Sequence, residues 1–163
     1  MLIIKWFVIV VVLLVVVAIA AGELGLLQGT PPTDLGVRDG KLKPPSMTEN
    51  SVTSQAALYP DHPQRKYADI APLPVKGDGP ATLAKIKAIV EGMVGAEVVK
   101  SEPDYLYAQF TTKLMKFVDD VEFWYDPAAK VIQVRSASRV GRGDLGVNRK
   151  RIEAVRSALE ATK

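Results

Sequence analysis

A glycine- and arginine-rich stretch near the C-terminus is the clearest pattern that could do chemistry. Residues 141–146, GRGDLG, match G-x-G-x-x-G, the pattern of loops that hold a dinucleotide phosphate. A dinucleotide-binding fold also needs a second parallel strand and a ribose-binding acid farther along, and only seventeen residues follow Gly146. The spacing therefore argues against dinucleotide binding and leaves a simpler anion site as a hypothesis.

A helix that begins after this loop would present free backbone N–H groups and a positive dipole end to an anion. Residues 135–156 carry seven basic and two acidic side chains, a net charge of +5, in a chain of net charge +3. A phosphate, a carboxylate or a lipid head group could bind there. Alternatively, the arginines pair with acidic side chains of the chain itself, namely Asp119, Asp120, Glu122 and Asp144. The candidate anion-binding residues are Arg135, Arg139, Arg142, Asp144, Asn148, Arg149 and Arg151.

Two carboxylates on one predicted strand could do acid–base work. Asp120 and Glu122 are two positions apart, so they project from the same strand face, about 7 Å apart. Arg135 on the neighbouring strand would lower their pKa values, which suits an ion pair better than a general acid. The same face carries aromatic side chains that could stack on a ligand or lie under the N-terminal arm, namely Tyr105, Tyr107 and Trp124.

The composition excludes several kinds of site. The chain has no cysteine and one histidine, so it has no disulfide, thiolate zinc site, iron–sulfur cluster, cysteine nucleophile or multi-histidine metal site. Ser136 and Ser138 have no histidine near them in the sequence to act as a base. We therefore predict no metal, no cofactor and no catalytic residues, and we expect a protein that is not an enzyme.

The N-terminal segment is apolar enough to cross a membrane. Residues 6–21 are sixteen consecutive apolar residues, and residues 2–21 suffice to span a bilayer if Lys5 reaches the interface. A cleaved signal peptide is the alternative, because residues 18–20, Ala-Ile-Ala, resemble a cleavage site. The basic Lys5 precedes the segment and Glu23 follows it, which favours a cytoplasmic N-terminus. A domain anchored outside the cytoplasm is not expected to bind nucleic acid, despite an isoelectric point near 9.1.

The remaining chain predicts an α+β domain. Nine of the eleven prolines fall between residues 31 and 80, so residues 23–66 are predicted to form an extended tether or packed arm after an anchor over residues 1–22. Residues 67–163 are predicted to form an antiparallel sheet of about four to five strands with two helices on one face. The predicted strands are 68–75, 96–101, 105–112, 118–125 and 130–138, and the predicted helices run from Pro80 to Gly92 or Gly95 and over 147–161.

A turn over residues 126–129 sets the register of the last two strands. It places Val121 opposite Val134 on an apolar face, and Asp120 opposite Arg135 on the polar face. A slip of one residue would exchange these faces.

Three segments resemble the DUF1499 family: residues 118–125, VDDVEFWY; 134–141, VRSASRVG; and 144–151, DLGVNRKR. Residues 44–56, PPSMTENSVTSQA, are similar to the N-terminal signature of the same family, and the resemblance covers about residues 44–160. It implies a small envelope or plastid-associated protein of bacteria or plants, from a family with no established activity. It also implies cysteine in many members at the position of Ser51, so a redox role of that cysteine cannot apply to this chain.

Three hypotheses about function follow. The first is a non-enzymatic accessory or scaffolding subunit in a bacterial inner membrane, with its C-terminal domain in the periplasm, that binds an envelope membrane-protein complex. The second is a binding module for an anionic small molecule or lipid head group at the arginine-rich loop. The third is an enzyme that uses Asp120 or Glu122.

Overall fold

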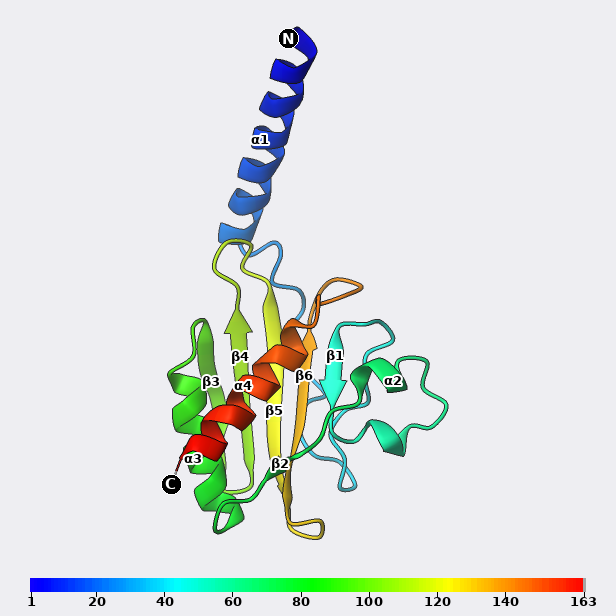
Figure 1. The fold of residues 1–163 in the computed structure, drawn as a ribbon, viewed down its shortest axis with the longest axis vertical. Helices are drawn as coiled ribbons and strands as arrows, with labels where there is room; N and C mark the ends of the chain where they lie inside the picture. Colours follow the sequence, from blue (N-terminus) through cyan, green and yellow to red (C-terminus); the bar gives the residue numbers. More distant parts are fainter. Residues whose placement is uncertain (163) are drawn as a thin grey trace.

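A six-stranded antiparallel sheet forms the body of the protein beyond its first helix (Figure 1). The structure is a computed structural model and describes residues 1–162. Five strands follow the order β1 (Ser51–Thr53), β6 (Val131–Ser138), β5 (Val118–Asp126), β4 (Tyr105–Thr111) and β3 (Ala96–Ser101), and β2 (Leu73–Pro74) also pairs with β6. The helices are α1 (Leu2–Glu23), the 3₁₀ helix η1 (Ala56–Leu58), α2 (Arg65–Ala68), α3 (Gly79–Glu91) and α4 (Val147–Ala161).

The predicted fold class is confirmed, and the sheet has one or two strands more than predicted. The additional strand, β1, lies within the segment predicted to be a tether or arm, and α2 lies near its end. The predicted strand 68–75 shortens to the two residues of β2. Pro72 and Pro74 account for this, because proline has no N–H group to donate to a ladder.

The helices α3 and α4 lie side by side across one face of the sheet (Figure 1). Their apolar side chains recur at helical spacing, and the inward residues of β5 and β6 alternate with polar ones, so one continuous core forms between the layers. The fully buried core side chains include Ile86, Val90, Val121, Phe123, Ile132, Val134, Ile152, Val155 and Leu159.

Local signals fix both ends of α3. The Asp78 side chain caps the helix by accepting a hydrogen bond of 2.7 Å from the backbone N–H of Ala81. Gly95 in the turn to β3 has φ of +78°, and a Cβ there would lie 2.3 Å from the carbonyl oxygen of Thr111. Only glycine fits this turn without moving the backbone.

The predicted register of β5 and β6 is wrong by two residues. Phe123 pairs with Val134, Glu122 with Arg135 and Asp120 with Ala137. The cause lies in the turn: β5 continues to Asp126, whose side chain accepts hydrogen bonds of 3.0 Å from two turn N–H groups. A shift of two residues preserves which side chains share a face, so the predicted faces are correct.

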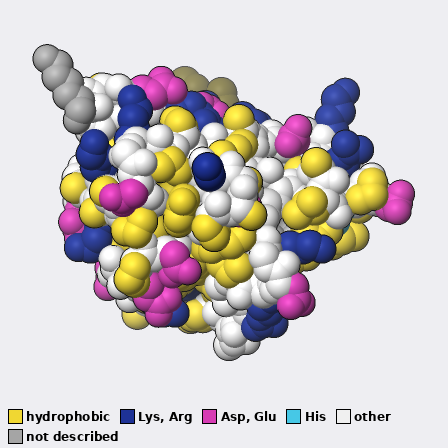
Figure 2. All heavy atoms as spheres, turned by 90° about the horizontal axis from the view of Figure 1, so that it is seen from below, with side chains coloured by type: hydrophobic (Ala, Val, Ile, Leu, Met, Phe, Trp, Pro, Cys, Tyr) yellow, Lys and Arg dark blue, Asp and Glu magenta, His cyan; other side chains and the backbone are white. Residues whose placement is uncertain are grey.

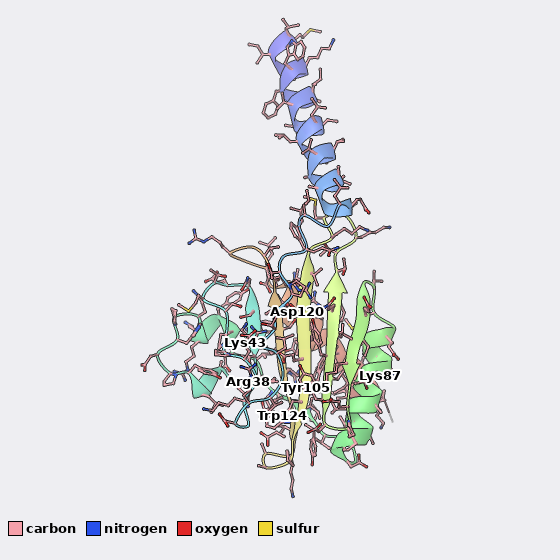
Figure 3. The ribbon with its side chains drawn as sticks, turned by 180° about the vertical axis from the view of Figure 1, so that it is seen from behind. Arg38, Lys43, Lys87, Tyr105, Asp120 and Trp124 are labelled. Carbon is pink, nitrogen blue, oxygen red and sulfur yellow. The ribbon has the colours of Figure 1, made fainter. Side chains whose placement is uncertain are left out.

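The arm crosses the face of the sheet opposite to α3 and α4. Leu42 from the arm is only 2% exposed and packs with Tyr105 and Trp124 in a second, smaller core. The backbone N–H of Gly36 donates a hydrogen bond of 2.8 Å to Glu122. Figure 3 shows this side, with Lys43 and Arg38 of the arm beside Tyr105 and Trp124. The arm is thus part of the folded domain rather than a free tether.

Candidate functional site

The polar face of β4, β5 and β6 carries the acidic and aromatic side chains that the sequence pattern predicts on one face of the sheet. Tyr105 donates a hydrogen bond of 2.7 Å to Glu122 Oε1, and Tyr107 donates one of 2.6 Å to Asp120 Oδ1. Burial, followed by the neighbouring carboxylate, raises the pKa of Tyr105 and of Tyr107. Both tyrosines are therefore neutral donors that hold the carboxylates in place.

Glu122 and Arg135 form a loose buried pair. The Glu122 side chain is fully buried, and its Oε2 lies 3.8 Å from Arg135 Nη1 and accepts no hydrogen bond. Arg135 is 4% exposed, and its Nε donates a hydrogen bond of 3.3 Å to the carbonyl oxygen of Pro44. Burial raises the pKa of Glu122 and lowers the pKa of Arg135. Arg135 does lower the pKa of Glu122, as expected from the sequence, but burial outweighs this attraction and the net shift is upward.

Arg139, rather than Arg135, is the partner of Asp120. Two parallel hydrogen bonds join them, Nε to Oδ2 at 2.9 Å and Nη2 to Oδ1 at 2.8 Å. Both side chains are at most 5% exposed, so this is a buried bidentate pair of the strong kind. The hydrogen bonds that Arg139 donates to Asp120 raise the pKa of Arg139. Asp120 is thus engaged by a guanidinium and a phenol, an arrangement suited to structure rather than to proton transfer.

The other candidate basic residues do not converge on one site. Arg151 reaches Asp119 at 2.6 Å and stacks over the ring of Phe110, on the helix-covered side of the sheet. Arg149 donates a hydrogen bond of 2.6 Å to the carbonyl oxygen of Tyr67 in α2. Arg142 is exposed in the loop between β6 and α4. The alternative in which arginines pair with the chain's own carboxylates describes Arg139 and Arg151.

The N-terminus of α4 already holds an anion, the carboxylate of Asp144. Its two oxygens accept hydrogen bonds of 2.9 Å from the backbone N–H groups of Gly146 and Asn148, and it also accepts one from Tyr67. Burial opposes ionisation, but these hydrogen bonds outweigh it and lower the pKa of Asp144. Burial, together with the hydrogen bond that Tyr67 donates to Asp144, raises the pKa of Tyr67 to about 12. The glycine-rich loop thus closes on its own side chain where a phosphate would bind.

Asn148 is the centre of a buried polar network that sequence reasoning did not predict. Its side-chain amide donates to the carbonyl oxygen of Asn50, to Ser138 and to Asp144, and its Oδ1 accepts from Ser136 and Arg151. Asn50 and Tyr67 lie far from Ser136 and Ser138 in the sequence, so no local pattern joins these residues. The signal for Asn50 was its place in the signature NSV, where Ser51 accepts a hydrogen bond of 2.8 Å from the Ser46 N–H.

A cleft of about 660 Å³ opens between the arm and the sheet, at the end of the sheet toward α1. Arg135, Asp120 and Arg139 form its floor, and residues 30–34 and 43–47 of the arm form its walls. Within residues 1–162, no cluster of three or more histidine, aspartate or glutamate side chains could hold a metal ion.

These features define a small α+β domain behind one N-terminal apolar helix, with its polar sheet face closed by its own arm. The helix α1 is long and apolar enough to cross a membrane, a criterion that a signal sequence also meets. The chain belongs to the DUF1499 family, because the model of that family, described as a protein of unknown function, matches residues 41–159. No curated protein and no solved structure matches it significantly.

Proposed function

We propose that this protein is a single-pass, membrane-anchored accessory subunit that binds a membrane protein of the cell envelope and does no chemistry of its own. Its N-terminus lies in the cytoplasm and its domain in the periplasm of a bacterial inner membrane. Lys5 before α1 and the acidic Glu23 after it support this orientation.

The observation that carries the proposal is the direct contact between α1 and the domain. Gly22, the last buried residue of α1, lies so close to the loop between β4 and β5 that a Cβ would be 2.7 Å from the Met115 carbonyl oxygen. Glu23 forms an ion pair of 3.2 Å with Lys116 of the same loop. The anchor therefore holds the domain at a set height above the bilayer, within reach of neighbouring membrane proteins.

The chemistry of the polar face supports a non-enzymatic role. Asp120 and Glu122, the residues with which an enzyme would act, each have a tyrosine hydrogen bond and an arginine beside them, and both are buried. A general acid or base must reach a substrate within hydrogen-bond distance. The arm occupies that position over Glu122 through Gly36.

The test is purification of the full chain, tagged at its C-terminus, from native membranes in mild detergent. We expect an intact N-terminus by mass spectrometry and a stoichiometric membrane protein in the eluate. In a matched variant, Gly22→Leu separates α1 from the loop, and we expect the partner to be reduced while membrane insertion persists. A chain found intact in the membrane but purifying alone, also after cross-linking in the membrane, contradicts the proposal, as does a chain cleaved after Ala20.

A second candidate function, binding of an anionic small molecule, is favoured by Arg135. This buried guanidinium has one long hydrogen bond and one long ion pair, and it faces the cleft. We expect inorganic phosphate or acetate to raise the melting temperature of the full chain in detergent, since a ligand at a hundred times its Kd stabilises by about 2.7 kcal/mol. The shift should disappear in Arg135→Lys and persist in the exposed control Arg142→Gln. Absence of a shift in the unmodified protein rejects this candidate.

A further inference from the structure

The exposed hydrophobic side chains of the domain gather at the end that faces α1. Leu24 and Leu26 follow α1 directly, and Leu114 occupies the loop that packs against it. Leu145 belongs to the turn between β6 and α4, and Val147 is the first residue of α4. Val94 lies beside Val147 and Lys113, because all three line one pocket. Six of the ten large hydrophobic residues that are exposed beyond α1 thus lie at this end.

The position of these loops follows from the path of the chain. Figure 1 shows the β4–β5 loop touching the lower end of α1 and the β6–α4 loop at the same end of the sheet, while the β5–β6 turn lies at the opposite end. Gly29 fixes this arrangement, because it lies against Arg139 and Val140 at the start of the β6–α4 loop. Figure 2 shows the opposite end, where acidic and basic side chains lie among the hydrophobic ones.

Leu145 is presented to solvent at a cost. It is 93% exposed and its φ is +52°, a left-handed conformation that a non-glycine residue adopts with strain. The Leu145 side chain therefore contributes almost nothing to packing within the folded domain. Leu114, at 62% exposure, is likewise at the tip of its loop. Both side chains are free to leave water for an apolar environment, a transfer that is favourable for a leucine side chain.

Cations surround these leucines. The side chains of Lys113, Arg142 and Lys150 are exposed, and within residues 1–162 none of these three side chains forms a hydrogen bond or an ion pair. The acidic side chains nearby are Glu49, beside Gly143, and Glu23, which is paired with Lys116. Asp144 also lies in this loop, but it is 9% exposed and its carboxylate accepts hydrogen bonds from Tyr67 and from backbone N–H groups of α4. Hydrophobic tips with basic side chains behind them are the pattern of a surface that rests in the head-group region of an anionic bilayer.

We infer that this end of the domain is a membrane-contacting surface: Leu114 and Leu145 enter the interfacial region of the bilayer, and Lys113, Arg142 and Lys150 contact lipid phosphates. The inference rests on the proposed anchoring by α1, which brings these loops to the bilayer. The anchor and the loops then hold the domain at three points, so that its orientation to the membrane is fixed as well as its height.

The test uses the absence of cysteine. Full-length chains carrying Leu114→Cys, Leu145→Cys or the control Ala128→Cys in the β5–β6 turn are labelled with an environment-sensitive fluorophore and reconstituted into vesicles. The vesicles contain phosphatidylcholine alone or with an equal part of phosphatidylglycerol, and brominated lipids report contact with the bilayer. We expect quenching several-fold stronger at positions 114 and 145 than at 128, and stronger with phosphatidylglycerol. The triple variant Lys113→Gln/Arg142→Gln/Lys150→Gln should remove the difference between the two lipids.

Each result is decisive for one part of the inference. A carbonate wash first separates chains anchored by α1 from those that are not, so failure of anchoring is seen separately. If anchored chains show quenching at positions 114 and 145 no stronger than at 128, the inference is overturned. The inference is also overturned, in favour of a protein partner, if the cysteines at positions 114 and 145 are protected from labelling in native membranes but not in vesicles. Equal quenching in both lipids overturns the attraction of the three basic side chains to anionic head groups.

Discussion

Asn148→Leu is expected to lower the free energy of unfolding by about 4 kcal/mol, because it removes five hydrogen bonds from a buried polar network. Leucine keeps the branched shape of asparagine, but its two methyl groups are bulkier than the amide atoms, so crowding around the buried position adds to the loss. The hydroxyl of Ser136, the carbonyl oxygen of Asn50 and part of the Arg151 guanidinium would each lose a hydrogen bond while remaining buried. The change is measured by urea unfolding in detergent, followed by Trp124 fluorescence in a Trp6→Phe background.

The matched control is Ser157→Leu on the exposed side of α4. It makes the same kind of polar-to-leucine change in the same helix, and we expect an effect within about 0.5 kcal/mol. If the two variants lose similar stability, the network around Asn148 does not hold α4 to the sheet. The interpretation of Arg151 as a structural residue would then lose its basis.

The sequence predicted the parts of the fold that depend on local patterns. The apolar spacing of α4 placed that helix at residues 147–161, as observed, and the alternation along β5 placed Asp120 and Glu122 on the face opposite the core. These features depend on residues close in the chain. The pairing of β1 with β6 depends on residues more than eighty positions apart, and three-residue strands carry no periodicity to indicate it.

The partners of the charged residues could not be predicted for the same reason. A turn one residue later than expected replaced Asp120 by Glu122 opposite Arg135 and left Asp120 to Arg139. This register depends on Asp126, which remains in β5 while its side chain accepts hydrogen bonds from two N–H groups of the turn. The pKa of Glu122 is raised because burial outweighs the opposing effects of the hydrogen bond from Gly36 and of Arg135, a balance that the sequence alone does not show.

The glycine-rich loop shows how one motif can have two physical uses. Glycines before a helix allow the backbone to turn and expose N–H groups, whether the anion is a phosphate or a carboxylate of the chain. Here Gly146 adopts φ of +75° and Asp144 supplies the carboxylate. The acidic residue inside the motif is the sequence feature that distinguishes the two uses, because its carboxylate would repel a bound phosphate.

Asp144→Asn is therefore expected to lower the free energy of unfolding at pH 7 by about 3 kcal/mol. The carboxylate accepts from two backbone N–H groups, from the amide of Asn148 and from Tyr67. An asparagine at this position has one acceptor oxygen, and its NH₂ group would face donors. It also removes a negative charge from the N-terminus of α4, which the helix dipole stabilises.

The loss should depend on pH with a definite sign. The pKa of Asp144 is lowered in the folded protein from its usual value of 3.8, so the native state favours the ionised form. The stability that this ionisation contributes is fully present above pH 3.8 and is lost as pH falls through the lower folded pKa. We expect the gap between the unmodified protein and Asp144→Asn to be constant from pH 7 to about pH 5 and to narrow below pH 4. Urea unfolding at pH 7, 5, 4 and 3 measures this gap.

Asp61→Asn, which changes an exposed carboxylate, should show no gap at any of these values. A gap for Asp144→Asn that stays constant down to pH 3 or widens in acid would mean that the side chain acts through its shape and not through its charge.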